Sequence, residues 1–210
     1  MASRKPPSRL AAPGGDRNTA AMSETDTTEY LSNQFLIAMP ALEDENFNHS
    51  VTLLCEHSDQ GALGLIINRP LQLKLTEMLD QMDLPRGALD QDSSIYWGGP
   101  VAPERGFVIH EGAGAWDSTM AVGGNLYITT SRDILKAIGE GRGPKHYFVA
   151  LGYAGWSAGQ LENEILSNSW LNTPVDSAIL FRTPASERWK LATRLLGVDP
   201  TQLGGEAGHA

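Results

Sequence analysis

The chain has 210 residues, of which 41% are hydrophobic and 20% are charged, and its formal net charge is −9. This composition is typical of a soluble globular protein with a buried core. No apolar run approaches the roughly 18 residues that a membrane span needs, so we expect no membrane association.

The negative charge lies in the body of the chain. The first 28 residues carry four basic and three acidic side chains, which leaves 12 basic and 22 acidic side chains for the remainder. Non-specific DNA affinity comes from Lys and Arg side chains that displace counterions. We therefore expect no direct binding of nucleic acid by this acidic body.

The ends of the chain differ in pattern from its middle. Residues 1–28 lack hydrophobic periodicity and are predicted to form a disordered tail, within which Met22 is an alternative start to Met1. Residues 29–203 are predicted to form one domain, and 204–210 a flexible end. The N-terminus has no apolar segment of a secretory signal, which favours a cytoplasmic location.

The first half of the domain is predicted to contain a strand, a hairpin and a helix. The strand covers 35–39 and ends at Pro40, whose missing N–H interrupts a ladder. Runs at 50–56 and 61–68 are rich in β-forming residues and flank a short polar connection, which indicates a hairpin. Apolar residues at helical spacing then predict a helix over 74–82.

The second half alternates between the two kinds of element. Strands are predicted at 95–97, 106–110, 125–129, 147–151 and 178–181. Helices are predicted at 130–138, 160–166 and 184–196, and the glycine-rich segment 152–159 is predicted to be a turn. A hairpin mixed with helices favours a single α+β domain, in which helices flank a mixed, strongly curved sheet that could close toward a barrel.

Several separate segments resemble the YqgE/AlgH family. They are Leu31–Pro40, Phe47–His57, Gly61–Pro70, Gly98–Val101 and Gly152–Trp156, in the family's order. The resemblance implies a compact α+β protein, and some members of the family are described as transcriptional regulators linked to alginate production. It brings no agreed catalytic residues, cofactor or substrate.

Two groups of residues are candidates for ligand binding. Asn68 and Arg69 follow an apolar strand, where an amide could orient a ligand and a guanidinium could hold a carboxylate or phosphate. The alternative is a turn in which Asn68 bonds local backbone and Arg69 pairs with a surface acid. The second group belongs to the glycine-rich segments and consists of Gly98, Gly99, Gly152, Gly155, Trp156 and Gln160.

The glycine-rich segments match neither the Walker motif nor G-x-G-x-x-G, so nucleotide binding is only weakly indicated. Their glycines could instead allow positive φ and close packing beneath Trp156. A free N–H near Gln160, at the start of a helix, could still hold an anion.

Cys55 is the only cysteine, which excludes an intramolecular disulfide. It is a candidate redox thiol, and on a strand it would share a face with His57, whereas its apolar neighbours favour a buried structural role. Ser157 fits the G-x-S-x-G spacing, but an α/β-hydrolase needs a larger parallel sheet, and the only histidine after Ser157 is His209 in the predicted flexible end, so the match is interpreted as a coincidence.

The histidines show no metal-ligand spacing, and we expect neither a metal nor a cofactor. The leading hypothesis is a non-enzymatic binding or regulatory protein that uses a cleft between Asn68-Arg69 and the glycine-rich turns, with a small ligand or a protein as partner. The alternative is a hydrolase or a thiol enzyme that uses Ser157 or Cys55.

Overall fold

The computed structural model describes residues 30–42, 44–87, 89 and 93–197. In this part of the chain ten strands form one sheet, in the order β10-β1-β2-β3-β9-β6-β8-β7, with β5 paired to β9 and β4 paired to β5. The strands are β1 (Gln34–Ala38), β2 (Val51–Ser58), β3 (Gly61–Ile66), β4 (Pro70–Lys74), β5 (Ser94–Trp97), β6 (Val101–Glu111), β7 (Thr119–Gly123), β8 (Leu126–Thr129), β9 (Tyr147–Ser157) and β10 (Trp170–Pro174).

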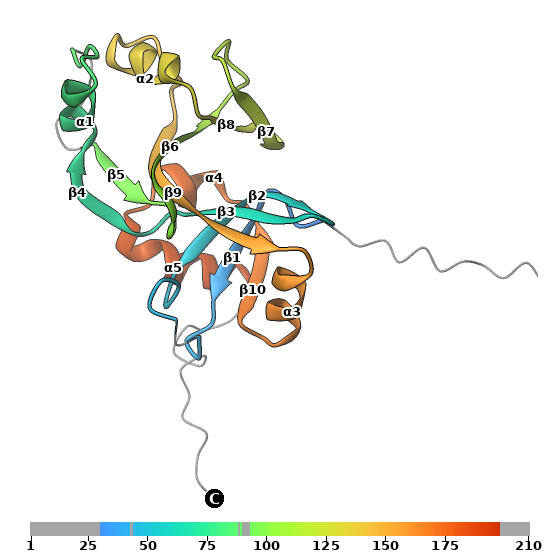
Figure 1. The fold of residues 1–210 in the computed structure, drawn as a ribbon. Helices are drawn as coiled ribbons and strands as arrows, with labels where there is room; N and C mark the ends of the chain where they lie inside the picture. Colours follow the sequence, from blue (N-terminus) through green and yellow to red (C-terminus); the bar gives the residue numbers. More distant parts are fainter. Residues whose placement is uncertain (1–29, 43, 88, 90–92, 198–210) are drawn as a thin grey trace, which may run out of the picture.

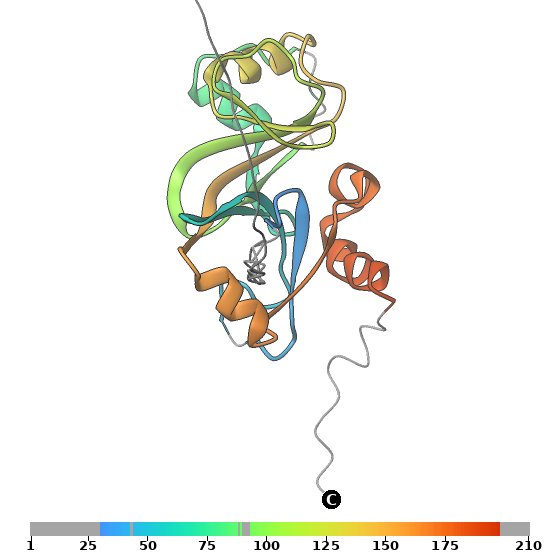
Figure 2. The ribbon, with the colours of Figure 1, turned by 90° about the vertical axis from the view of Figure 1, so that its right-hand side faces the viewer.

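Strand β9 connects the two halves of the sheet. Its first part pairs with β5 in parallel and with β6 in antiparallel orientation, and its last four residues pair with β3. The sheet is therefore mixed, and it curls strongly along this strand (Figures 1 and 2). The predicted α+β class and the curved sheet are confirmed by this architecture.

Five helices flank the sheet in the described residues: α1 (Leu75–Gln81), α2 (Arg132–Gly139), α3 (Gln160–Leu166), α4 (Ser177–Phe181) and α5 (Ala185–Leu195). Helices α1 and α2 pack together at one end of the molecule, and α4 and α5 lie along one side of the sheet (Figures 1 and 2). No described helix combines the length and apolar character needed to cross a bilayer.

The main core lies between the sheet and helices α4 and α5. Phe35, Leu53 and Phe148 from the sheet pack with Leu180 and Ala192 from these helices. Two smaller clusters lie beneath α1 and α2 and beneath α3. Apolar burial thus attaches every helix to the sheet and stabilises the fold.

The predicted hairpin is confirmed, since β2 and β3 pair in antiparallel register and only Asp59 and Gln60 separate them. The predicted helices correspond to α1, α2, α3 and α5, with ends shifted by up to two residues. The short strands β4, β7 and β10 were not predicted. The expectations for residues 1–28 and 204–210 lie outside the described residues.

Two predicted elements were wrong. The segment predicted as a strand at Ala178–Phe181 belongs to helix α4, where the Asp176 side chain accepts a hydrogen bond of 2.9 Å from the N–H of Ile179. A short apolar run fits either element, and this N-cap favours the helix. The predicted turn at 152–159 is mostly strand β9, because its residues 154–157 pair with β3 and Tyr153 pairs with Val101 of β6.

Candidate ligand-binding site

Among the described residues, Arg188 is the only arginine or lysine that is almost completely buried, with 3% of its surface exposed. It lies on helix α5, on the face that also buries Ala192 one turn later. Side chains four residues apart share one face of a helix, so packing of α5 on the sheet carries this arginine inward. Trp189 helps to fix the helix, because its indole N–H donates a hydrogen bond of 3.1 Å to the carbonyl of Ala38.

The Arg188 guanidinium is held by neutral groups. Its Nε donates to the carbonyl of Thr183 at 3.0 Å, its Nη1 donates to the carbonyl of Ile67, and its Nη2 lies 3.4 Å from the Tyr96 hydroxyl. The guanidinium carbon is 4.9 Å from the ring centre of Tyr96 and 5.2 Å from that of Phe148. Ring quadrupoles attract a cation and partly replace its lost hydration.

No carboxylate in the described part of the chain forms an ion pair with Arg188. Desolvation lowers the pKa of the guanidinium from its usual value, opposed by the nearby Tyr96 side chain. Arginine nevertheless stays protonated in proteins at neutral pH. The site therefore holds a buried positive charge, which is costly unless an anion compensates it.

A cavity of about 290 Å³ lies beside this charge, between the sheet and helices α4 and α5. Hydroxyl-bearing residues line one part of it: Ser93, Ser94, Tyr96 and Tyr147. Apolar or aromatic residues line the rest: Leu75, Phe148, Val149, Leu180 and Phe181. We call this space the Arg188 cavity, and its size is at the lower end of the range for small-molecule sites.

The structure places Asn68 and Arg69 around the loop that precedes β2. Asn68 accepts a hydrogen bond of 2.9 Å from the N–H of Val51 and donates one of 2.8 Å to the carbonyl of His49. Arg69 donates to the carbonyls of Glu45 and Asn48, each at 3.0 Å. Asn68 thus bonds backbone, as the alternative expected, but its partners lie 17 and 19 residues away and not in its own turn. The printed partners of Arg69 are backbone carbonyls and not the expected surface acid.

Gly98, Gly99 and Gly152 are brought together by close backbone packing. A Cβ on Gly98 would lie 2.3 Å from the carbonyl oxygen of Gly152, and a Cβ on Gly152 would lie 2.4 Å from that of Gly99. The segment between β5 and β6 thus crosses β9 with no room for side chains. This geometry explains the glycines without a ligand.

Trp156 and Gln160 belong to a hydrogen-bond network around Glu164. The Glu164 carboxylate accepts from the indole N–H of Trp156 at 2.9 Å and from that of Trp170 at 2.8 Å. Gln160 donates to the same carboxylate at 2.9 Å and accepts from the Ser157 hydroxyl at 3.0 Å. The hydroxyl of Ser157 thus bonds an amide, and no described histidine serves it as a base.

These predicted residues do not share one hollow. Gly155 and Trp156 border a depression along β3, whereas Gln160 of α3 borders another one together with Ser157 at the end of β9. Neither depression includes Asn68 or Arg69. The Phe47 ring links the two groups instead, since it lies in the loop that Arg69 holds and contacts Trp156 at 6.1 Å between centroids. Ligand binding by this set stays a prediction.

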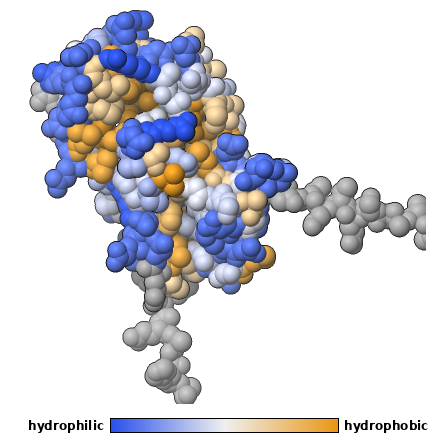
Figure 3. Space-filling view, viewed as in Figure 1, coloured by the Kyte–Doolittle hydropathy of each residue, from blue (hydrophilic) through white to orange (hydrophobic). Residues whose placement is uncertain are grey.

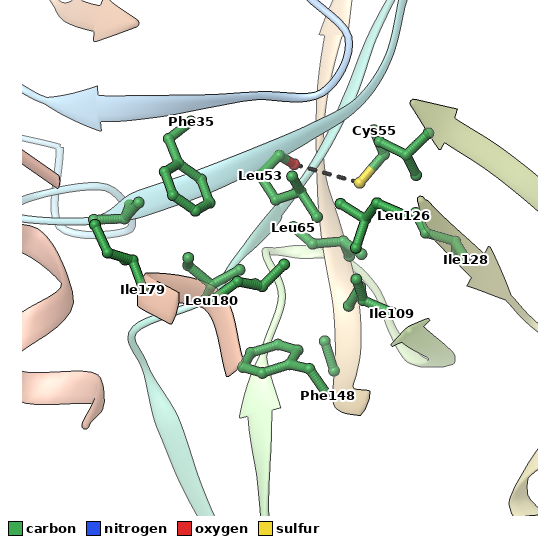
Figure 4. Close-up of a cluster of buried hydrophobic side chains, with 14 of the residues drawn as sticks. Phe35, Leu53, Cys55, Leu65, Ile109, Leu126, Ile128, Phe148, Ile179 and Leu180 are labelled. Atoms are coloured by element: carbon green, nitrogen blue, oxygen red, sulfur yellow. Dashed lines mark hydrogen bonds between the residues drawn. The ribbon is translucent and has the colours of Figure 1, made fainter. Parts of the chain in front are cut away.

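Cys55 lies in the main core, with 3% of its surface exposed (Figure 4). Its thiol is 3.4 Å from the carbonyl oxygen of Leu53, and burial raises its pKa far above the usual value. A β-bulge between Leu54 and Glu56 interrupts the alternation that was expected to align Cys55 with His57. The contacts of His57 run instead to the backbone N–H of Leu31 and the carboxylate of Glu162.

Sequence reasoning missed the Arg188 cavity. A signal was present, because Arg188 is spaced four residues from Ala192 and seven from Leu195 on a predicted helix. An arginine in this register is usually placed at the margin of the apolar face, with its charge in water. The pattern therefore places Arg188 beside the apolar face of the helix, but it does not indicate that the charged group is buried.

Known proteins resemble this chain over most of its length. A family model described as DUF179, AlgH-like, matches residues 35–201. A UPF0301 protein of Thioalkalivibrio sulfidiphilus is 55% identical over 180 residues, which cover 86% of this chain and 97% of the relative. A UPF0301 protein of Ralstonia pickettii is 49% identical over 190 residues, which cover 90% of this chain and all (100%) of the relative.

Solved structures agree with this assignment. The solution structure of the AlgH protein from Pseudomonas aeruginosa matches with a TM-score of 0.72 at 47% identity, covering 89% of this chain and 100% of that one. A crystal structure of a Corynebacterium diphtheriae protein matches with a TM-score of 0.68 at 20% identity, covering 85% and 93%, and supports the fold alone. The family resemblance of the sequence is thereby confirmed, and this chain belongs to the AlgH-like (UPF0301) family.

Proposed function

We propose that this chain is a non-enzymatic binding protein that holds a small anionic ligand in the Arg188 cavity. The observation that carries the proposal is a buried guanidinium beside a cavity, without a carboxylate partner among the described residues. A buried charge without an oppositely charged partner strongly destabilises the folded state. An anionic ligand would supply that partner for Arg188.

The groups around the cavity favour binding over catalysis. No His, Asp, Glu, Lys or Cys is among the described residues that line it. General acid–base and nucleophilic chemistry usually depend on such groups at the reacting centre. Serine and tyrosine hydroxyls and one arginine suit recognition of a polar anion.

The family resemblance implies a regulatory role. This role is compatible with the proposal if ligand binding changes the conformation of helices α4 and α5. Leu180 and Phe181 of α4 and Arg188 of α5 line the cavity, so a bound anion would contact both helices. A ligand can shift a conformational equilibrium only by its difference in affinity between two states. We propose that the ligand orders these helices for a protein partner in the cytoplasm, and that the acidic body does not bind DNA directly.

The test is thermal unfolding in the presence of acetate, lactate, inorganic phosphate and sulfate, with sodium chloride at matched ionic strength as the reference. The wild type is compared with Arg188→Gln and with Arg194→Gln, which removes the same charge from an exposed position on the same helix. We expect at least one anion to raise the melting temperature of the wild type and of Arg194→Gln, with saturation, but not that of Arg188→Gln. An equal response of all three proteins, or no response beyond chloride, contradicts the proposal.

A further inference from the structure

The Arg188 cavity also contains features that select among anions, and this inference rests on the proposed function. We infer that the ligand is a short-chain hydroxycarboxylate, which Arg188 and Tyr96 bind through its carboxylate group. Such a ligand fits the donors of the guanidinium, the charge of the cavity and the chemistry of its walls.

The guanidinium keeps two donors for a ligand. An arginine side chain carries five N–H hydrogens, one on Nε and two on each terminal nitrogen. The carbonyls of Thr183 and Ile67 and the hydroxyl of Tyr96 occupy one hydrogen on each nitrogen. Among the described residues, each terminal nitrogen therefore has one N–H without a partner, and two N–H groups of one plane can match the two oxygens of a carboxylate.

Tyr96 adds a donor next to this pair. Its oxygen accepts from Arg188 Nη2 at 3.4 Å, and a phenol that accepts a hydrogen bond still has its own hydrogen to donate. The Tyr96 ring is held by stacking on Phe148, with 4.0 Å between the ring centroids. A carboxylate at Arg188 would thus meet a fixed hydroxyl as well as the guanidinium.

The charge of the site favours a monoanion over a dianion. Arg188 is the one cationic side chain among the described residues that line the cavity. A phosphate or sulfate dianion would keep a second charge that nothing there compensates, in a chain with a formal net charge of −9. Uncompensated charge away from water is costly, so a carboxylate fits better.

The walls favour a short ligand with both polar and apolar parts. The hydroxyl groups of Ser93 and Tyr96 can exchange hydrogen bonds with a ligand hydroxyl. Leu75, Val149 and Leu180 provide apolar contact for a short hydrocarbon segment. The volume of about 290 Å³ suits a ligand of a few heavy atoms.

The experiment is isothermal titration calorimetry with 3-hydroxybutyrate as the probe, at constant ionic strength. Three comparisons isolate its groups: 3-hydroxybutyramide lacks the charge, butyrate lacks the hydroxyl, and inorganic phosphate replaces the carboxylate. We expect 3-hydroxybutyrate to bind the wild type, with affinity at least about tenfold above that of the other three compounds.

Variants then locate the binding. Tyr96→Phe keeps the ring and removes the hydroxyl, and should lower the affinity for 3-hydroxybutyrate about tenfold. Ser93→Phe fills the cavity from its wall without changing Arg188, so it should abolish binding even if Arg188→Gln fails to fold. Arg194→Gln should bind like the wild type.

The outcomes separate this inference from the proposed function. One outcome is that phosphate binds, that Ser93→Phe and Arg188→Gln abolish this binding, and that 3-hydroxybutyrate does not bind. This outcome would refute the hydroxycarboxylate ligand but retain the small-anion site. Equal binding of butyrate and 3-hydroxybutyrate would refute the role of the ligand hydroxyl. If neither carboxylates nor phosphate bind in a way that depends on the cavity, both the inference and the anion site are wrong.

Discussion

Trp156 on strand β9 donates a hydrogen bond of 2.9 Å from its indole N–H to the carboxylate of Glu164 on helix α3. The same carboxylate oxygen accepts the indole N–H of Trp170 on β10 at 2.8 Å. One glutamate therefore joins two strands that lie apart in the sheet, and α3 is the element that positions it. Hydrogen bonds to a charged acceptor are about twice as strong as neutral ones.

We expect Glu164→Gln to lower the free energy of unfolding by about 1.5–3 kcal/mol. The amide offers a single acceptor oxygen to the N–H groups of Trp156, Trp170 and Gln160, so at least one donor loses its partner. Urea denaturation followed by tryptophan fluorescence measures the change. Glu187→Gln on the exposed surface of α5 is the control, with an expected change within about 0.5 kcal/mol. Equal stability of the two variants would contradict the role of the network.

Gly152 and Gly159 form a matched pair for testing the close crossing of the backbone. Their φ angles are +72° and +74°, but a Cβ on Gly152 would lie 2.4 Å from the Gly99 carbonyl oxygen, whereas a Cβ on Gly159 would meet nothing within 4 Å. Alanine at either position should cost about 1–2 kcal/mol for the left-handed backbone. Gly152→Ala should cost about 1–3 kcal/mol more because of the clash. Thermal unfolding measures the melting temperatures of Gly152→Ala and Gly159→Ala. Similar values would show that the crossing tolerates a side chain.

Arg69→Ala should lower the free energy of unfolding by about 1–3 kcal/mol, because it removes two hydrogen bonds from a charged donor to the carbonyls of Glu45 and Asn48. Arg86→Ala is the control, since Arg86 pairs with Asp80 at the exposed surface, where such pairs contribute about 0–1 kcal/mol. Urea denaturation compares the two. If Arg69→Ala leaves the stability unchanged, Arg69 is free to serve a ligand, as the sequence first indicated.

The Ser177→Ala variant should show a pH-dependent loss of stability. The Ser177 hydroxyl, followed by His146, holds the pKa of the Glu111 carboxyl below its ordinary value of 4.5. A lowered native pKa stabilises the fold above the unfolded pKa, and this contribution is lost as the pH falls through the native pKa. The stability difference between the wild type and Ser177→Ala should therefore be largest at neutral pH and shrink below pH 4.5. Urea denaturation across this range measures it, with Ser186→Ala on exposed α5 as the control; a difference that is constant with pH would contradict the assignment.

Cys55 should resist iodoacetamide in the folded protein and react in urea. The thiolate is the reactive form, and burial raises the pKa of this thiol. Because the sequence has one cysteine, mass spectrometry of the intact protein reports on this site alone. Rapid labelling of the folded protein at neutral pH would contradict burial and restore Cys55 as a candidate redox thiol.

Elements with a clear local pattern could be predicted from the sequence. The hairpin of β2 and β3 follows from β-forming runs around a short polar connection, and α3 follows from its helical spacing. Strands β7 and β10 are short and partly exposed, and their residues show little alternation. Strand β4 does alternate, but it has only five residues and begins at Pro70, a residue that disfavours a strand. Their β structure depends on pairing with partners elsewhere in the chain.

The candidate site shows the same division. By itself the sequence determined the family, the single cysteine and the presence of a helix around Arg188, because these follow from residue identity and local spacing. Only the tertiary structure decided that Arg188 is buried beside Ile67 and Tyr96, and that Asn68 and Arg69 hold a loop. Burial and hydrogen-bond partners arise between residues far apart in the chain, and a local pattern carries no information about which of them meet.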